Sequence, residues 1–371
     1  MQLFGSKELL EDVIHKNLCI GCGACVDLCP YIRSHKGRIA MLFPCTLEKG
    51  RCWAYCPKVE VDLEELSERI FAGPYKGDPL GHHRAVKIAR AGNAVPKGPF
   101  QAGGAVSALM SFALKKGHIS GAVLTGRDGF LPVPRMVTDA VGVFGCSSSK
   151  YTAAPTLSAL NRALREGYER LGVVATPCQT MAIAQMRGNP TGEEDFTDPF
   201  GLVVGLFCTW ALDFSAFEKF IPKYVDKDTI TKMDIPPPPS EIMEIFTEND
   251  RIEIPLKEVR ELVPNTCAYC TDMTSEFSDI SVGVLEGRPD MNTIIIRTEK
   301  GDEIVNQAQE EGYLIVDDIP GENLNHLVEA ALNKKRRAFM KSHEEGLLNN
   351  NEDGKRSCLR AKPETVEKII N

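Results

Sequence analysis

Several features that mark common classes of protein are missing from this chain of 371 residues. No stretch reaches the roughly 18 consecutive apolar residues that a membrane-spanning helix needs. Residues 1–17 have neither the apolar core nor the small-residue cleavage site of a secretory signal. Basic residues are outnumbered, 43 against 51 acidic ones, for a net charge of −8, so we do not expect nucleic acid as a partner. We therefore expect a cytoplasmic protein with no direct membrane span.

Common nucleotide-binding and hydrolase motifs are also absent. No G-x-G-x-x-G follows an apolar run, and there is no P-loop, hydrolase elbow or H-E-x-x-H motif. An ordinary nicotinamide-binding Rossmann domain is therefore not supported. The one basic run, Lys334–Arg337, lies in a helical pattern, and we interpret it as a solvated helix face rather than a binding patch.

Cysteine, by contrast, is abundant, with thirteen in the chain. Disulfides are rare in the cytosol, so clustered cysteines there usually indicate metal binding or redox catalysis. Seven of the thirteen lie between Cys19 and Cys56. This density separates a small N-terminal unit from the rest of the chain.

Residues 19–30 follow the pattern C-x2-C-x2-C-x3-C-P without deviation. Three thiolates from one tight loop can hold a cubane cluster, and Gly21 and Gly23 let the backbone wrap around it. The fourth cysteine of such a run, here Cys29 before Pro30, ligates the other cluster of a two-cluster module. Zinc is the alternative, but zinc sites usually pair two separate C-x-x-C units. The run therefore favours iron–sulfur clusters.

A second set closes with the same C-x3-C-P pattern but has no cysteines at Thr46 and Lys49, where a regular run would have them. By ferredoxin-type crossing, we expect one [4Fe–4S] cluster on Cys19, Cys22, Cys25 and Cys56. The other site is left with Cys29, Cys45 and Cys52. Three thiolates suit a [3Fe–4S] cluster, although a non-cysteine ligand or a cysteine of another domain or subunit would complete a [4Fe–4S] cluster.

The domain organisation follows from composition. We expect a ferredoxin-like domain over residues 1–72, a Gly/Pro-rich linker over 73–84 and an α/β (α+β) domain over 85–340. Strands are expected over residues 85–92, 121–126, 171–176 and 201–208, and helices over 104–116 and 156–170. Residues 341–371 are predicted to be an exposed polar tail with Cys358 as a free surface cysteine.

Four further cysteines lie in the second domain. Cys178 and Cys208 each lie at the end of an apolar strand, and Cys267 and Cys270 form a C-x-x-C pair. These four are a plausible set for a third cluster, of the [4Fe–4S] type. Two buried core cysteines with an isolated zinc or redox C-x-x-C remain an equal alternative on spacing alone.

Seven short segments of this domain carry a resemblance, in the order QAGGAVS (101–107), KYTAAP (150–155), TPCQTM (176–181), GLFC (205–208), CAYCTD (267–272), SDISVG (278–283) and NTIIIRTEKG (292–301). Residues 85–337 thereby resemble the beta-subunit family of coenzyme F420-reducing hydrogenase and F420-dependent formate dehydrogenase. The sequence departs from the family at Ala102, where members often carry Asp. Extra N-terminal clusters also occur in relatives.

The resemblance implies that this domain is a flavoprotein domain, which binds FAD and one [4Fe–4S] cluster and passes a hydride between FAD and F420. It favours Cys178, Cys208, Cys267 and Cys270 as the cluster ligands. It implies flavin contacts from Gly103, Gly104, Ser107, Lys150, Tyr151, Thr152, Thr176 and Gln179. A glycine pair that opens a helix lets backbone N–H groups approach a phosphate, although such a pair is more often a simple turn.

The implied chemistry converts hydride transfer into single-electron transfer, since FAD supports both. Electrons would pass between a partner subunit, the N-terminal clusters, the third cluster, FAD and F420, in either direction. Lys150 is a candidate catalytic residue that would place positive charge near the flavin or an anionic substrate, with a solvated lysine as the alternative. We assign Arg297 and Lys300 to a hairpin rather than to the anionic tail of F420.

The chain lacks the nickel-binding C-x-x-C pairs of a hydrogenase large subunit and the length for a molybdopterin domain. We expect it to be one subunit of a redox complex, with a hydrogenase, formate dehydrogenase, heterodisulfide-reductase-type or membrane dehydrogenase partner. Two other interpretations stay open: the same relay with a nicotinamide or a tetrapyrrole in place of F420, or a pure electron relay without flavin. Cys146 is left without a role.

Overall fold

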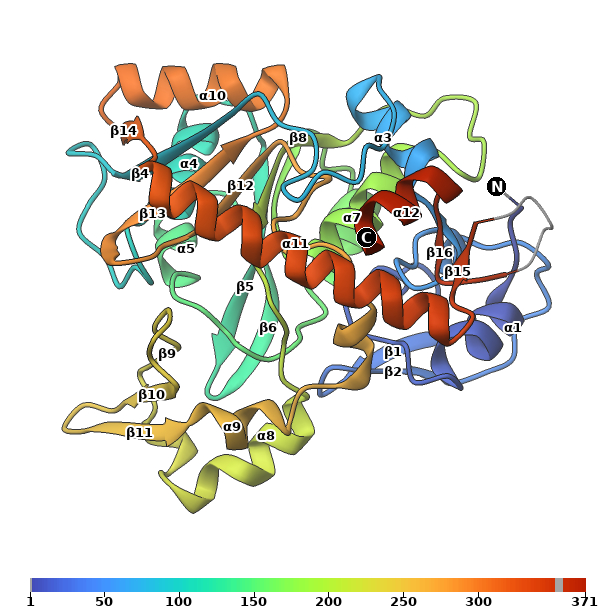
Figure 1. Cartoon of the computed structure of the whole chain (residues 1–371), viewed down its shortest axis with the longest axis horizontal. Helices are drawn as coiled ribbons and strands as arrows, with labels where there is room; N and C mark the ends of the chain where they lie inside the picture. The colour runs from blue at the N-terminus through green and yellow to red at the C-terminus, as the bar shows by residue number, and fades with distance from the viewer. Residues whose placement is uncertain (1, 351–355) are drawn as a thin grey trace.

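A mixed sheet of eight strands forms the centre of the computed structural model, which describes residues 2–350 and 356–371 (Figure 1). The strand order is β14-β4-β13-β12-β8-β7-β5-β6. The strands span β4 Ala85–Ala91, β5 Gly121–Asp128, β6 Leu131–Val137, β7 Leu171–Ala175, β8 Phe200–Leu206, β12 Ile280–Leu285, β13 Arg288–Ile296 and β14 Leu314–Asp318. β5, β7, β8 and β12 run parallel, and the outer pairs are antiparallel. The expected α/β domain is confirmed, with a parallel centre.

Helices cover both faces of this sheet, because successive strand residues point to opposite sides. Leu202 and Val204 of β8 pack in one cluster with α4 (Ala105–Lys115) and α10 (Glu299–Glu310), and α5 (Ala140–Gly145) borders it. Val203, between them, packs with α6 (Leu157–Arg165) and α7 (Pro177–Arg187) on the other face. No helix in the described part of the chain is both long and apolar enough to cross a bilayer.

The N-terminal unit is built from short elements, the last of which ends at Phe71. They are α1 Ser6–Leu9, the π-helix η1 Leu10–Ile14, β1 Ile32–His35, β2 Arg38–Met41, α2 Arg51–Ala54, β3 Val61–Asp62 and α3 Leu63–Phe71. Its first cysteine loop lies against α6, where the Asn161 amide donates to the carbonyl oxygens of Ala24 (3.0 Å) and Val26 (2.7 Å). Gly23, with φ +87°, approaches so closely that an added Cβ would lie 2.5 Å from the Pro155 carbonyl oxygen. The unit is therefore docked on the main domain.

The C-terminal segment does not form the exposed tail that its polar composition predicts. α11 (Gly321–Glu344) is followed by β15 (Leu348–Asn349), β16 (Leu359–Arg360) and α12 (Pro363–Ile370). β16 pairs with β3, so this segment joins the sheet of the N-terminal unit. Cys358 is 3% exposed, and its thiol donates to the Lys58 carbonyl oxygen. The predictions of an exposed segment and a surface Cys358 are wrong, and residues 351–355 of that segment lie outside the described residues.

The basic run on α11 is also mostly buried. Lys334 is 5% exposed and Lys335 0%, and the Lys335 amine forms an ion pair with Glu276 at 2.7 Å. Of the four residues of the run, only Arg337 is exposed. The interpretation as a solvated helix face is wrong. Four consecutive residues of a helix point in different directions, and two of these lysines face the protein interior.

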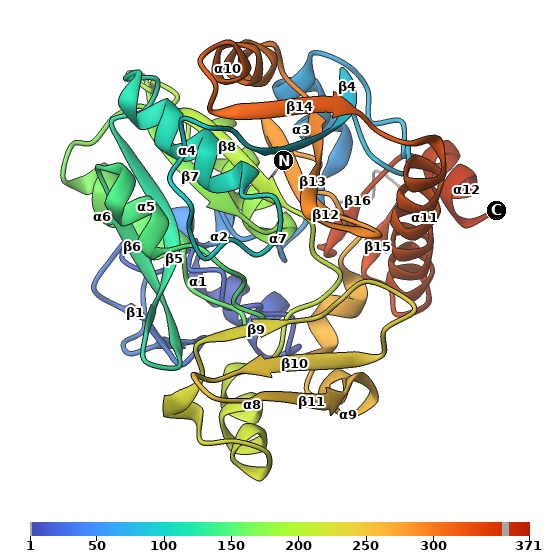
Figure 2. The same cartoon turned by 90° about the vertical axis from the view of Figure 1, so that its left-hand side faces the viewer.

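A separate lobe follows β8, and the sequence did not predict it. Its strands are β9 Lys232–Asp234, β10 Ile242–Phe246 and β11 Arg251–Pro255, and its helices are α8 Phe214–Phe220, η2 Ile221–Lys223, η3 Lys227–Thr229 and α9 Leu256–Arg260. Figure 2 shows the lobe below the large sheet, with the tip of the β5–β6 hairpin reaching towards it. The 3-10 helix η4 (Asn265–Tyr269) returns the chain to the main domain.

Arg297, at the end of the β12–β13 hairpin, ties the linker to the main domain. Its side chain is 1% exposed and donates to the carbonyl oxygens of Leu80 (2.7 Å), His82 (2.8 Å) and Thr274 (3.1 Å) and to the Ser281 hydroxyl (2.7 Å). Lys300, by contrast, lies in the first turn of α10 rather than in the hairpin. The linker, although irregular, is thus fixed in place.

Replacing Arg297 by Met is expected to lower the free energy of unfolding by about 3 kcal/mol, because several buried acceptors would lose their charged donor. Chemical denaturation followed by circular dichroism measures the change. The control is Arg288→Met, since Arg288 is exposed and pairs only with Asp290 beside it. Equal stability of the two variants would contradict the proposed anchoring.

Candidate functional site: a thiol-rich edge of the sheet

The carboxyl ends of three parallel strands meet at one edge of the large sheet. Arg127 lies at the end of β5, Thr176 and Cys178 follow β7, and Cys208 follows β8. In open α/β sheets, side chains at this edge line the crevice where ligands bind. Chain order alone therefore brings two of the predicted cluster ligands to the same place.

Cys178 is the second residue of α7, whose start is fixed by a capping box between Thr176 and Gln179. The Cys178 thiol lies 3.4 Å from the Thr176 hydroxyl. Burial raises the pKa of Cys178 to about 11, and the Thr176 hydroxyl and the Lys58 charge oppose this rise. Gln179 also donates to the Ala154 carbonyl oxygen at 3.0 Å, which ties α7 to the 150–155 segment.

The C-x-x-C pair of η4 completes a group of four thiols at this edge. The backbone N–H of Cys208 donates to the Met273 carbonyl oxygen, which holds the loop after Cys270 against the end of β8. Burial raises the pKa of Cys208, and the thiols of Cys178, Cys270 and Cys267 raise it further, against the opposing charge of a nearby lysine. The structure thus brings the four predicted ligands within electrostatic reach of one another.

The sequence assigns the N-terminal thiols to two groups, the first with Cys19, Cys22, Cys25 and Cys56 and the second with Cys29, Cys45 and Cys52. Burial raises the pKa of Cys56 to about 12, and Cys19 adds to the rise. Burial raises the pKa of Cys52 to about 11, and its two group members add to it. Cys52 also acts on Cys25 of the first group, so the two groups lie near each other and their ligand roles stay predictions.

No three Cys, His, Asp or Glu side chains within residues 2–350 and 356–371 are arranged to hold a single metal ion. A cubane cluster spaces its thiolates farther apart than one ion does.

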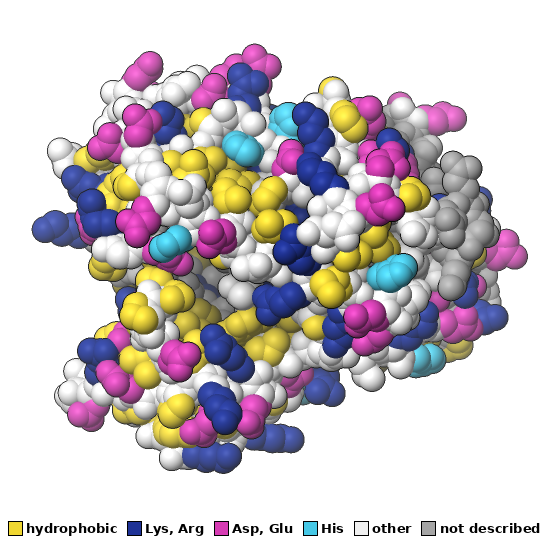
Figure 3. All heavy atoms as spheres, in the orientation of Figure 1, with side chains coloured by type: hydrophobic (Ala, Val, Ile, Leu, Met, Phe, Trp, Pro, Cys, Tyr) yellow, Lys and Arg dark blue, Asp and Glu magenta, His cyan; other side chains and the backbone are white. Residues whose placement is uncertain are grey.

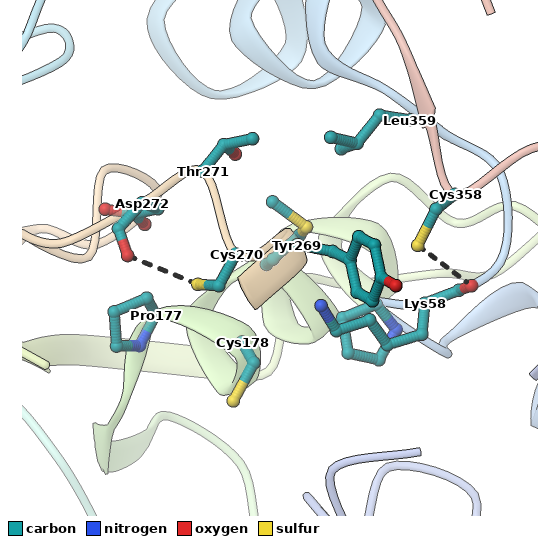
Figure 4. A pocket seen from close by; sticks show the side chains of 11 residues that line it. Lys58, Pro177, Cys178, Tyr269, Cys270, Thr271, Asp272, Cys358 and Leu359 are labelled. Carbon is teal, nitrogen blue, oxygen red and sulfur yellow. Dashed lines mark hydrogen bonds between the residues drawn. The ribbon is translucent and has the colours of Figure 1, made fainter. Parts of the chain in front are cut away.

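The first and third thiol groups adjoin each other. Among the thiols that raise the pKa of Cys22, after burial, Cys178 acts most strongly. A small pocket lies beside the third group, next to Pro57 and Lys58, which directly follow Cys56, and Figure 4 shows Lys58, Cys178 and Cys270 in it. Its lining comprises Pro57, Lys58, Pro177, Cys178, Met181, Tyr269, Cys270, Thr271, Asp272, Cys358 and Leu359. Cys358, which the sequence left without a role, is thus part of the wall of this pocket.

Most predicted flavin contacts gather around the 146–152 loop. Ser107 of α4 lies 3.0 Å, hydroxyl to hydroxyl, from Ser147. The Lys150 amine donates to the carbonyl oxygens of Ser147 and Ser148, each at 2.9 Å, so Lys150 shapes this loop. The Tyr151 hydroxyl accepts from the N–H of Ile235 after β9. Thr152 forms an isolated β-bridge with Leu212.

The start of α4 lies beside this loop. Gly103 precedes Gly104, which has φ +80° and is the N-cap of α4. An added Cβ on Gly104 would lie 2.6 Å from the Phe100 ring, so the turn requires glycine. Such a turn exposes the positive end of a helix dipole to any anionic group beside it. Thr176 and Gln179 instead form the cap of α7. Gln179 contacts Ala154, which follows the 146–152 loop, rather than the glycine turn.

Arg127 is a candidate binding residue that sequence reasoning missed. It lies near Lys150 and donates to the carbonyl oxygens of Ser149 (3.5 Å) and Thr231 (3.3 Å). Burial lowers the pKa of Arg127, and neither cation forms a salt bridge with a carboxylate among the described residues. Figure 3 shows a hollow, bordered by hydrophobic side chains, between the main domain and the β9–β11 lobe. Two half-buried cations without acidic partners in that region suit an anionic ligand.

Comparison with known proteins agrees with this geometry. Residues 88–161 and 168–322 match the models of the N-terminal and C-terminal parts of the coenzyme F420 hydrogenase/dehydrogenase beta subunit. Residues 12–31 match the 4Fe-4S binding domain. The chain belongs to the coenzyme F420 hydrogenase/dehydrogenase beta-subunit family. The predicted family and the N-terminal iron–sulfur segment are confirmed.

Individual members of the family also resemble this chain over most of their length. It is 33% identical to coenzyme F420 hydrogenase subunit beta of Methanothermobacter thermautotrophicus, over 63% of this chain and 84% of that protein. It is 29% identical to one of the subunits of the F(420)H(2) dehydrogenase of Methanosarcina mazei, over 84% of this chain and 88% of that protein. A chain of the F420-reducing [NiFe] hydrogenase complex from Methanosarcina barkeri superposes with a TM-score of 0.66 at 25% identity, covering 72% of this chain and 93% of that one. This chain is therefore an iron–sulfur subunit of the F420-dependent hydrogenase/dehydrogenase type.

Proposed function

We propose that this beta-subunit family member binds FAD and transfers electrons between coenzyme F420 and three iron–sulfur clusters. The observation that carries the proposal is the order in which the thiol groups and the candidate flavin site follow one another through the molecule. Two N-terminal thiol groups lead to a third at the sheet edge, beside a glycine-opened helix and two cations without acidic partners among the described residues. A flavin bound there supplies chemistry that links hydride transfer to single-electron transfer.

The residues of the chain have distinct parts in this function. Arg127 and Lys150 would hold the anionic part of the flavin or of F420, and Gly104 lets the α4 backbone approach it. Lys150, the predicted catalytic residue, would act through charge and through the shape of its loop. Thr176 fixes Cys178 at the start of α7 and so sets the distance between the third cluster and the flavin side.

The proposal is tested with anaerobically purified chain whose clusters have been reconstituted. Stoichiometric flavin should be present, and reduced F420 should bleach it while NADH should not. Bleaching by NADH or by a tetrapyrrole instead would favour the other hydride carriers, and absence of any flavin would favour a pure electron relay. Partner subunits are those of a hydrogenase, formate dehydrogenase or heterodisulfide-reductase-type complex, and co-purification from the native host would identify them.

Flavin affinity should fall as the pH rises. Burial, helped by the nearby Arg127 charge, lowers the pKa of Lys150 to about 8, and Cys146 opposes this. The amine is therefore mostly charged at pH 7 and mostly neutral at pH 9, so we expect the Kd for FAD to rise about tenfold over that range. Fluorescence titration of the flavin-free chain measures it. Lys150→Met should bind weakly at both pH values with no such slope, and the same slope in that variant would refute the assignment.

A further inference from the structure

Two buried lysines from distant parts of the chain flank the third thiol group. Lys334 of α11 is 5% exposed, and its amine donates to the carbonyl oxygens of Cys208 (2.6 Å) and Asp272 (2.8 Å). Lys58, two residues after Cys56, is 7% exposed and donates to the Thr266 carbonyl oxygen at 3.3 Å. Both amines are thus fixed beside the cysteines of one cluster site.

Neither amine forms a salt bridge within residues 2–350 and 356–371, whereas the adjacent buried Lys335 pairs with Glu276. An uncompensated buried cation is costly and persists only where a negative charge offsets it. The acidic groups that act on Lys58 are the thiols of Cys358, Cys270, Cys178 and Cys267. On Lys334 they are Cys270, Cys208, Asp272 and Cys267. The cluster site is therefore the main counter-charge for both lysines.

The two lysines differ in which thiol groups they reach. Lys58 acts on Cys19 of the first group as well as on Cys178 of the third, and Figure 4 shows Lys58 in the same pocket as Cys178 and Cys270. Lys334 acts on Cys208 and Cys267 of the third group, from the side of α11. The Lys58 charge therefore acts on two cluster sites, and the Lys334 charge acts on the third alone.

We propose that Lys58 and Lys334 are positioning residues that raise the reduction potential of the third cluster, with Lys58 also raising that of the first. This rests on the proposed function, since it requires the clusters to be present. Each cluster gains one electron on reduction, with no bond made or broken, and becomes more negative by one charge. A fixed cation in a low-dielectric interior stabilises the more negative state, and buried charge near a cluster is one of the factors that set its potential.

The consequence is that electrons arriving from the flavin or from the N-terminal clusters are held on the cluster next to the flavin site. A third cluster with a raised potential accepts single electrons readily. It can therefore store one while the second electron of a hydride passes on. Neither lysine is among the main influences on Cys52, so the second N-terminal cluster would keep a potential of its own.

The test is an EPR-monitored redox titration of the reconstituted full chain and its variants, with iron content measured on each sample. Lys334→Met should lower the potential of the third cluster alone by at least a tenfold change in its one-electron equilibrium constant, which is about 59 mV. Lys58→Met should lower the potentials of both the first and third clusters. Lys334→Arg should stay near the wild-type value, and Lys219→Met, on the exposed face of α8, should change nothing.

Lys334→Gln separates charge from folding, because glutamine is neutral but can still donate to the Cys208 and Asp272 carbonyl oxygens. It should lower the potential as methionine does while keeping full iron content. Unchanged potentials in iron-replete Lys334→Gln and Lys58→Met would overturn the inference and leave the proposed function intact. Absence of the third cluster from the wild-type chain would overturn both.

Discussion

Replacing Cys178 by serine should break electron transfer between the hydride carrier and the N-terminal clusters while leaving those clusters in place. Cys178 is the member of the third thiol group that acts directly on Cys22 of the first group. It is also the ligand whose position α7 fixes, through the Thr176–Gln179 capping box. Its loss should therefore remove both a ligand and the shortest connection between the two groups.

Iron content should fall by about four atoms per chain. The rate at which reduced F420 reduces the N-terminal clusters should fall by more than the roughly 10–100-fold that loss of an outer-shell partner causes. Stopped-flow absorbance and iron assay measure the two effects. Cys146→Ser is the control, because Cys146 lies outside all three thiol groups. Full iron and an unchanged rate in Cys178→Ser would show that this cysteine is no ligand.

Replacing Arg127 by Met should remove most flavin binding. Its guanidinium is half-buried, and within residues 2–350 and 356–371 it donates to carbonyl oxygens and has no acidic partner. A charge-assisted bond to an anionic ligand contributes about 2–3 kcal/mol, so the Kd for FAD should rise roughly 30–150-fold. Isothermal titration of the flavin-free chain measures the change.

Arg135→Met is the matched control, since Arg135 lies on the paired strand β6 but is exposed. Its flavin affinity should match that of the wild type. If Arg127→Met binds FAD as tightly as Arg135→Met does, the anionic ligand lies elsewhere on the sheet edge.

The sequence was most informative where one physical factor dominated. Apolar runs such as 171–176 and 201–208 predicted strands, and these strands are apolar throughout because both of their faces are covered. Cysteine spacing predicted the N-terminal iron–sulfur segment, since a cubane cluster constrains how a short loop can supply ligands. Cys178 and Cys208 came together because both follow adjacent parallel strands.

Where several weak factors competed, the sequence predictions failed. Residues 341–371 are polar in composition, yet Leu348, Leu359, Val366 and Ile369 are spaced so that each is buried against the N-terminal unit or α11. Lys334 and Lys335 were assigned to solvent because most lysine runs are exposed, and only the fold shows which helix face they occupy. Arg127 carries no motif at all, since its significance comes from the lobe and loop that surround it.

The central proposal is that one chain converts hydride transfer into single-electron transfer. The most direct measurement is anaerobic mixing of the FAD-loaded, cluster-replete chain with sub-stoichiometric reduced F420, followed by rapid freezing and EPR. We expect each F420 oxidised to deliver two electrons, which are recovered as reduced flavin and reduced cluster signals together. Oxidation of F420 that leaves every cluster oxidised, or no oxidation of F420 at all, would contradict the proposal.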